Sequence, residues 1–274
     1  MTEVTRYRLD PRRDTPLLLL DCPADLSELA DPEKQAKARE TYETPGIVAV
    51  DNAVGEDVLA GLREGLTFDR RKFKDKFNQG IPKTPTFVAA RNEAARRITA
   101  LARALFGYTL PDYTGADMSY RPMVTENEPM HFDGYMVECG KTPLMSILNF
   151  DVLSRFWQVG PSFNELCKKE KKYITKVLNR LRDPYEVHQE LRGFGMKGGG
   201  PLGPGEPVHR VEFAPGTIWF ANPKTIAHQI VYGNGALFVT WIIDEPMCKC
   251  QKCTLEANGI RLREPEPEAV APAE

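Results

Sequence analysis

His131 and Asp133 stand one residue apart in the stretch EPMHFDGYM, and imidazole and carboxylate groups both bind metal ions. Residues i and i+2 of a β-strand point to the same side, so such a pair offers two ligands to one ion. His228 lies far downstream in a second apolar segment and can supply a third ligand. Two histidines and one carboxylate form the triad that holds Fe(II) on one face and leaves other coordination positions open. The sequence therefore predicts an iron centre, and with it the catalytic residues, at His131, Asp133 and His228.

Segments that read as short β-strands surround these ligands. They are GIVAVDNAV (46–54), DMSYRPMV (117–124), PMHFDGYM (129–136), PLMSILNFDV (143–152), HRVEFAP (209–215), GTIWFAN (216–222), HQIVYG (228–233) and ALFVTWIID (236–244). Gly, Pro and Asn residues separate them, and this arrangement is typical of an antiparallel barrel or jelly roll. We therefore expect an α+β, mainly β fold, in which a cupin-like double-stranded β-helix carries the metal.

Helical patterns precede and interrupt the strands. Asp31 can cap a helix over residues 31–43 that has Pro32 in its first turn. The other patterns with apolar residues at helical spacing cover 55–68, 92–107 and an insertion over 162–196. The basic, Pro-bearing segment 70–86 and the Gly-rich segment 197–207 are interpreted as loops.

Composition excludes several classes of protein. Hydrophobic residues make up 42% and charged residues 27% of the 274 residues, close to the average of globular proteins. The net charge of −2 provides no basic footprint, so nucleic acid is not expected as a partner. The apolar run of leucines near the N-terminus is too short for a signal peptide or a membrane span. We therefore expect a cytoplasmic protein that acts on a small molecule.

The cysteines suggest a second metal site. Cys248, Cys250 and Cys253 form a C-x-C-x-x-C cluster that can supply three thiolates to zinc. Cys139 or Cys167 would have to supply the fourth ligand. The alternative is a reduced loop without metal, because strong zinc signals pair two such clusters.

The chain resembles the Fe(II)/2-oxoglutarate-dependent dioxygenase superfamily and, within it, bacterial Kdo hydroxylases, which act on a sugar of the lipopolysaccharide inner core. The segments that carry the resemblance are SRFWQVGPSFNEL (154–166), LRDPYEVHQEL (181–191) and VEFAPGTIWFANPKTIAHQIVYG (211–233). The resemblance implies that His131, Asp133 and His228 bind Fe(II). It also implies 2-oxoglutarate and O2 as co-substrates and hydroxylation of an aliphatic C–H bond.

The chain departs from the superfamily where the distal carboxylate of 2-oxoglutarate is usually anchored. An Arg or Lys on the strand after the second histidine often serves, but QIVYGNGALFVTW contains no cation. The strand after H-x-D has none either, and Ser146 occupies the corresponding position. A dicarboxylate in an apolar barrel needs a charge-assisted partner, for which Arg121, Lys141 and Arg155 are candidates. We favour Arg121, which lies on the strand leading to the ligands.

Other residues are expected to complete the co-substrate pocket. Tyr120, Thr240 and Trp241 are placed to line it, and core packing is the alternative role for each. Ser146 joins them as a candidate on the neighbouring strand.

The substrate and even the use of 2-oxoglutarate stay open at this level. A Kdo-like sugar on a lipid would fit a cationic entrance such as RRKFKDKF (70–77) and would bring peripheral contact with a membrane. A secondary metabolite, an amino acid or a peptide is the alternative. An iron oxidase without 2-oxoglutarate and a non-catalytic jelly-roll binding module are the competing functions.

The expected domain organisation follows from these segments. Residues 1–45 form an N-terminal extension, and residues 46–246 form the double-stranded β-helix oxygenase domain with the helical insertion 162–196. Residues 247–274 form a Cys-containing tail whose acidic, Pro-rich end is expected to be disordered.

Overall fold

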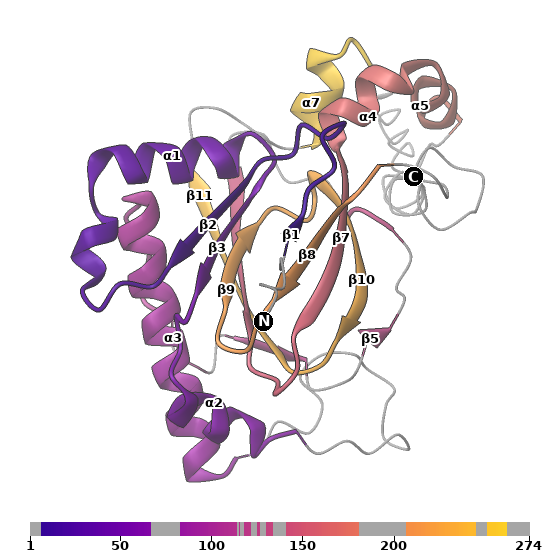
Figure 1. Ribbon diagram of the computed structural model, residues 1–274. Coiled ribbons are helices and arrows are strands. Elements are labelled where there is room, and N and C mark those ends of the chain that lie inside the picture. The colour runs from indigo at the N-terminus through magenta and orange to yellow at the C-terminus, as the bar shows by residue number, and fades with distance from the viewer. Residues whose placement is uncertain are drawn as a thin grey trace, which may run out of the picture.

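Two β-sheets face each other, and helices cover the outer side of one of them (Figure 1). The structure, a computed structural model, describes residues 7–66, 83–113, 115, 118–121, 125–126, 130–133, 141–180, 207–244 and 251–261. The side chains of Arg121, Thr125, Glu126 and Asp244 are outside this description.

The first sheet is five-stranded and antiparallel throughout, in the order β1-β8-β7-β10-β5. Its strands are β1 (Tyr7–Arg8), β8 (His209–Phe213), β7 (Arg155–Ser162), β10 (Ile226–Gly233) and β5 (Thr125–Glu126). The register of β10 on β7 shifts between Ile226 and His228, so the strand is irregular next to a predicted ligand. Such irregularities re-aim side chains at the ends of sheets.

The second sheet is six-stranded, in the order β2-β3-β9-β6-β11-β4. Its strands are β2 (Leu17–Asp21), β3 (Ile47–Asp51), β9 (Ile218–Ala221), β6 (Lys141–Asn149), β11 (Ala236–Asp244) and β4 (Ser119–Arg121). β2 pairs with β3 in parallel, and all the other pairs are antiparallel. This sheet is buried on both faces, because one face meets the first sheet and the other meets the helices.

Aromatic rings fill the space between the two sheets. Trp219 of β9 stacks on Phe213 of β8 with ring centroids 4.0 Å apart and an interplanar angle of 4°. Trp157 of β7 meets Trp219 edge to face at 5.5 Å. These large buried rings join the sheets into one core and form a rigid apolar floor.

The helical layer consists of α1 (Pro32–Glu43), α2 (Glu56–Arg63) and α3 (Pro85–Phe106), with the short 3-10 helix η1 (Leu26–Leu29) beside them. The predicted start of α1 is confirmed: the Asp31 side chain accepts hydrogen bonds from the backbone N–H groups of Glu33 and Lys34. Helix α3 begins earlier than the expected residue 92, because Thr84 caps it and Pro85 occupies its first turn. These start signals lie in a segment that was interpreted as a loop.

A second group of helices, called the cap below, covers one end of the sandwich (Figure 1). It consists of α4 (Phe163–Lys169), α5 (Lys171–Leu178) and α7 (Gln251–Ala257). The predicted helical insertion is confirmed over α4 and α5, and residues 181–206 lie outside the described part of the chain. Helix α7 was not predicted, since its sequence was considered only as a cysteine cluster.

Four strands of the described residues were also missed, and one of them is the short β5, which lies between two expected strands. β1 and β2 come from the expected N-terminal extension, yet they pair with β8 and β3 and so belong to the two sheets. β7 follows directly after β6 and supplies inward-facing residues to the core. Conversely, residues 130–133 of the expected strand 129–136 form a single bridge to β10.

None of the helices within the described residues is both long and apolar enough to cross a membrane.

Candidate metal centre

The three predicted ligands come together at one end of the sandwich. His131 and His228 form an antiparallel bridge, with N···O distances of 3.0 Å and 2.9 Å between their backbones. The backbone N–H of Asp133 donates to the carbonyl of Pro223 at 2.8 Å, which fixes the third ligand beside the start of β10. One ligand atom from each of the three side chains lies within 4.8 Å of the others.

This geometry fits one metal ion. The Nε2 atoms of His131 and His228 lie 3.1 Å and 3.8 Å from the same carboxylate oxygen of Asp133. The two imidazole rings are 4.6 Å apart between centroids. Two imidazole nitrogens and one carboxylate oxygen on one side of a point are the donor set that suits Fe(II) and leaves an open face.

The accessible side of the centre is the side of Asp133. The side chains of His131 and His228 are 5% and 4% exposed, whereas that of Asp133 is 39% exposed. A ligand that reaches the metal therefore approaches past the carboxylate, while the histidines are shielded from water.

The ring of His228 is held in one orientation by two contacts. Its Nδ1 lies 3.2 Å from the carbonyl oxygen of Ile226. Because a carbonyl only accepts, Nδ1 must carry the proton, which leaves the lone pair of Nε2 for a metal. Trp157 stacks on the ring at 4.9 Å with an interplanar angle of 23°. The ligand is thus oriented before any metal binds.

The residues between the ligands point the other way, into the cap. Phe132 is buried and meets Phe163 of α4 edge to face, with centroids 5.4 Å apart. Met130 and Ala227 join the same apolar cluster. Successive side chains therefore point in opposite directions: Met130, Phe132 and Ala227 pack in the cap, and His131, Asp133 and His228 face the metal position.

Two of the predicted co-substrate residues do not reach this centre. Ser146 lies opposite Val239 and Phe220 in the register, and both belong to the core beneath the helices. Trp241 is buried in the same core, where its indole N–H donates to the carbonyl of Pro111 at 3.4 Å. Both strands are apolar on each face, so the sequence alone could not show which residues face inward. The expectation for Ser146 and Trp241 is corrected accordingly.

The other candidates have different positions. Tyr120 is buried in the core beneath the helices, as Ser146 is. Thr240 is exposed and alternates in phase with Phe238, which packs in the core between the sheets. The backbone of Arg121 pairs with Ala236 at the edge of the second sheet, and its side chain, which the prediction concerns, lies outside the description. Lys141 is exposed at the start of β6.

Arg155 is the cation that the fold places inside the sandwich. It is 1% exposed, and it alternates in phase with Trp157 and Val159, which face the core. Its Nη1 donates to the carbonyl of Asn234 at 3.2 Å. A Cβ at Gly233 would lie 2.4 Å from Nη1, so the arginine needs the glycine beneath it.

Lys224 is a cation beside the centre that was not predicted from the sequence. It lies in the turn between β9 and β10, and its side chain is half-buried. Burial lowers the pKa of its amine, and the nearby carboxylate of Asp133 acts in the opposite direction. The signal for it was its place in NPKTIAH, a few residues before the second histidine.

The proposed zinc cluster falls largely outside the described residues, which include neither Cys248, Cys250 nor Cys139. Cys253 is half-buried on α7. Cys167 is enclosed in the apolar cluster of the cap, where burial raises the pKa of its thiol to about 12.

Comparison with known proteins bears on the fold. No protein-family model matches the chain, and a search of curated proteins finds no match. The structure does match a crystal structure of the Kdo hydroxylase KdoO, a non-heme Fe(II) alphaketoglutarate-dependent dioxygenase, in complex with alphaketoglutarate and Fe(III). The TM-score is 0.65 at 14% identity, over 90% of this chain and 97% of that chain. The chain shares its fold with this hydroxylase.

Two further structures of KdoO agree with this match. The apo structure gives a TM-score of 0.64 at 16% identity, over 88% of this chain and 95% of that chain. The complex with cobalt(II) gives 0.63 at 14% identity, over 90% and 97%. The predicted resemblance is confirmed at the level of the fold, and the low identity fits a divergent chain.

Proposed function

We propose that the protein is a non-haem iron oxygenase that uses 2-oxoglutarate and O2 to hydroxylate or otherwise oxidise an aliphatic C–H bond of a small molecule. The observation that carries this proposal is the convergence of His131, Asp133 and His228 within 4.8 Å, with one open side. We infer further that the strands of the two facing sheets within residues 46–246 form a double-stranded β-helix, to which β1 and β2 add one strand each. The match to KdoO supports both inferences.

The chain's own residues prepare the centre for this chemistry. Bound iron with its co-substrate and O2 would supply the oxidising power, as cofactors do in such enzymes. The hydrogen bond from Nδ1 of His228 directs the lone pair of Nε2 to the metal position, and Asp133 contributes the negative charge. Trp157 and the rings behind it exclude water from the inner side.

For the distal carboxylate of 2-oxoglutarate we propose Arg155 as the anchor. Its guanidinium lies against Gly233, and the strand from His228 to Gly233 runs about 16 Å. A five-carbon dicarboxylate is shorter than this span, so the Arg155 guanidinium would have to turn along β10 toward the metal to reach the distal carboxylate. A charge-assisted contact is strong in an apolar interior, where the dielectric constant is low. Arg121, the residue favoured by the sequence, is the alternative.

The proposed substrate is a Kdo-like sugar or another small metabolite such as an amino acid. An oxidase that needs no 2-oxoglutarate is the second candidate, because β10 and β11 carry no Lys or Arg between Ile226 and Asp244.

Anaerobic addition of Fe(II) and then 2-oxoglutarate tests the proposal. We expect the visible charge-transfer band of a 2-oxo acid chelated to Fe(II), and succinate after O2 is admitted. Asp133→Asn should lose both, because a two-histidine site no longer provides the facial set. Asp57→Asn, at an exposed position of α2, is the matched control. Iron binding without the band would support the oxidase, and failure to bind iron would contradict both functions.

A further inference from the structure

The turn between β9 and β10 forms one edge of the metal centre. It consists of residues 222–225 and is called the rim turn below. The carbonyl of Pro223 accepts the backbone N–H of Asp133 at 2.8 Å, so the turn is joined directly to the exposed ligand. The rim turn therefore borders the side from which a substrate reaches the metal.

Hydrogen bonds hold the rim turn in a fixed shape. The Asn222 side chain accepts from the backbone N–H of Lys224 at 3.1 Å, and its carbonyl accepts from that of Thr225 at 2.9 Å. The carbonyl of Lys224 accepts from Nε2 of Gln251, a buried residue of α7, at 2.6 Å. The position of a side chain on this turn is therefore set by β10, by the cap and by the segment that carries His131 and Asp133.

Lys224 carries the positive charge of the rim turn. Its side chain is half-buried, and the residue directly follows Pro223, whose carbonyl accepts the backbone N–H of Asp133. Asp133 would share its negative charge with a bound metal ion. The amine of Lys224 then remains as a cation at the open side, where partial burial strengthens its attraction for an anion.

Arg155 and Lys224 lie toward opposite ends of β10. Arg155 contacts Gly233, the last residue of the strand, whereas Lys224 precedes its first residue, Ile226. His228 lies between them. A co-substrate held by the buried Arg155 would extend inward, whereas Lys224 lies on the side from which a second reactant approaches.

We propose that Lys224 binds an oxyanion of the substrate, a carboxylate or a phosphate, at the rim of the metal centre. This inference rests on the proposed function, because it assigns the open side of the centre to the substrate. It narrows the substrate class to anionic molecules. Lys224 acts as a specificity residue that orients the substrate while a neighbouring C–H bond faces the metal.

Small anions near a paramagnetic metal provide the test. The full chain is loaded with Mn(II), and either inorganic phosphate or propionate is titrated while ³¹P or ¹H relaxation of the probe is measured. This test requires neither 2-oxoglutarate nor turnover. Absence of the charge-transfer band would count against the proposed function, whereas the binding of the anion probe is measured separately. Protein carrying His228→Ala, which lacks a metal ligand, measures the background from unbound Mn(II).

Three variants separate the proposed role from general electrostatics. Lys224→Met should weaken binding of the favoured probe by about ten- to a hundredfold, the effect of one charge-assisted contact. Lys224→Arg should retain most of the binding because it keeps the charge. Lys176→Met, which removes an exposed lysine of α5, should leave the probe affinity unchanged.

Each outcome either supports or overturns the proposed role of Lys224. A loss confined to phosphate or to propionate supports the proposal and identifies the oxyanion. Equal affinity in Lys224→Met and the unaltered protein overturns it, as does failure of the unaltered protein to bind either probe near the metal. Weaker Mn(II) binding in Lys224→Met also overturns it, because that result would show that the lysine merely holds Asp133 in place.

Discussion

At the scale of single residues, the centre depends on side chains whose orientation is set by neighbours rather than by the metal. His228 is held by the carbonyl of Ile226 and by the ring of Trp157. Arg155 is held by the carbonyl of Asn234 and by the space that Gly233 leaves. Preorganisation of this kind lowers the cost of binding a metal or a ligand.

The first prediction concerns Arg155. The unaltered protein should bind 2-oxoglutarate more tightly than 2-oxobutyrate, which lacks the distal carboxylate. Arg155→Met should remove most of that preference, about ten- to a hundredfold, because one charge-assisted contact is lost. Titration of the charge-transfer band with each ligand measures the preference, and Arg155→Lys should recover only part of it.

The matched control is Arg121→Met. Loss of the preference in this variant, with Arg155→Met unaffected, would show that the anchor is the residue favoured by the sequence. Thermal unfolding of each variant shows whether the buried substitution also destabilises the fold.

At the scale of elements, the segment that carries His131 and Asp133 packs with the cap as one unit. Phe132 packs on α4, and α7 donates a hydrogen bond to the rim turn through Gln251. The helices of the cap therefore position ligands that lie on strands. A substitution that loosens the packing of the cap should therefore change the metal affinity.

Phe132→Ala tests this coupling. Removing a buried aromatic side chain leaves a cavity, and we expect the free energy of unfolding to fall by about 3–5 kcal/mol. Metal affinity should fall as well, because the strand between the ligands loses its anchor. Urea unfolding and a Co(II) titration measure the two effects. Phe132→Leu should preserve most of both, and unchanged Co(II) affinity in Phe132→Ala would contradict the coupling.

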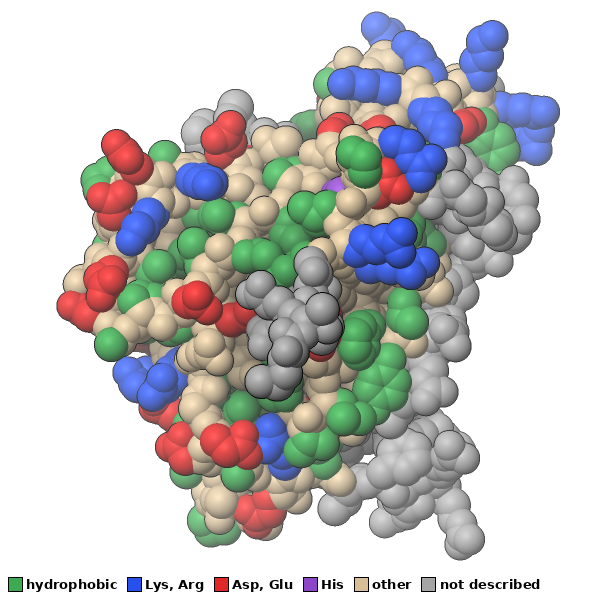
Figure 2. All heavy atoms as spheres, viewed as in Figure 1, with side chains coloured by type: hydrophobic (Ala, Val, Ile, Leu, Met, Phe, Trp, Pro, Cys, Tyr) green, Lys and Arg blue, Asp and Glu red, His purple; other side chains and the backbone are tan. Residues whose placement is uncertain are grey.

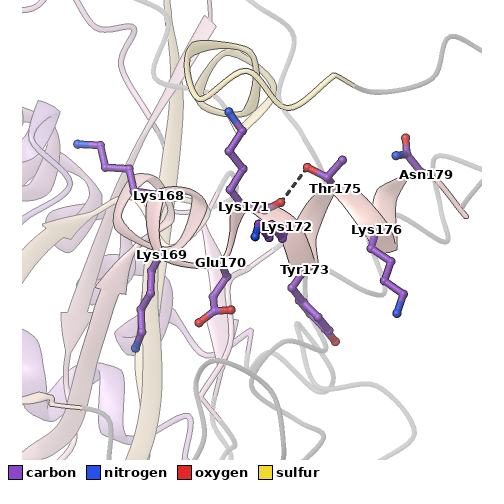
Figure 3. A pocket seen from close by; sticks show the side chains of 9 residues that line it. All are labelled: Lys168, Lys169, Glu170, Lys171, Lys172, Tyr173, Thr175, Lys176 and Asn179. Atoms are coloured by element: carbon purple, nitrogen blue, oxygen red, sulfur yellow. Dashed lines mark hydrogen bonds between the residues drawn. The ribbon is translucent and has the colours of Figure 1, made fainter.

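The surface of the cap concentrates positive charge. An open groove of about 860 Å³ is lined by Lys168, Lys169, Glu170, Lys171, Lys172, Tyr173, Thr175, Lys176 and Asn179 (Figure 3). The same cluster is the blue region over the cap in Figure 2. On α5, Lys172 and Lys176 are one turn apart, and the first turn of this helix carries no acidic residue. Like charges at this spacing destabilise a helix.

Lys172→Glu should therefore stabilise the protein slightly. It replaces a repulsive pair with an attractive one and places an acid near the helix N-terminus, for an expected gain of about 0.5 kcal/mol. Differential scanning calorimetry at low salt should show a small rise in Tm. The gain should shrink in 1 M NaCl because exposed charges are screened there. A rise of equal size at both salt concentrations would contradict the electrostatic explanation.

At the scale of the whole molecule, the N-terminal segment ties the two sheets together. β1 joins the first sheet and β2 joins the second, and the chain between them passes His209 of β8. Nδ1 of His209 accepts from the backbone N–H of Asp10 at 3.0 Å, so Nε2 must carry the proton and donate to the carbonyl of Thr15 at 2.9 Å. Burial lowers the pKa of this imidazole below its usual value, and Arg13 acts in the same direction.

The folded state therefore favours neutral His209, which predicts a pH dependence. Below the unfolded pKa of about 6.5, the unfolded chain binds a proton that the folded chain resists. This contribution to stability is fully present above that pH and is lost as pH falls toward the lower folded pKa. Urea unfolding between pH 7.5 and 5 should show a smaller decline for His209→Gln than for the unaltered protein. Equal slopes would place the acid sensitivity elsewhere.

The sequence by itself determined which residues are the candidate metal ligands, because the pattern of the first two is local and chemical. His131 and Asp133 are related by the two-residue period of a strand, and the distant histidine lies in a strand of the same kind. Helix α1 was equally readable, since Asp31 and Pro32 form a start signal that needs no tertiary context. Local hydrogen bonding and steric preference explain why both patterns can be read from the sequence.

Only the tertiary structure decided which side of each strand faces the metal. β6 is buried almost throughout, so no alternation of polar and apolar residues showed that Ser146 faces the helices and not the other sheet. The same holds for Trp241, an apolar residue in an apolar strand. Arg155 and Lys224 lie toward opposite ends of β10. Arg155 comes to this strand because β7 and β10, which are distant in sequence, pair with each other. Such placements depend on long-range packing, for which a single sequence carries no periodic signal.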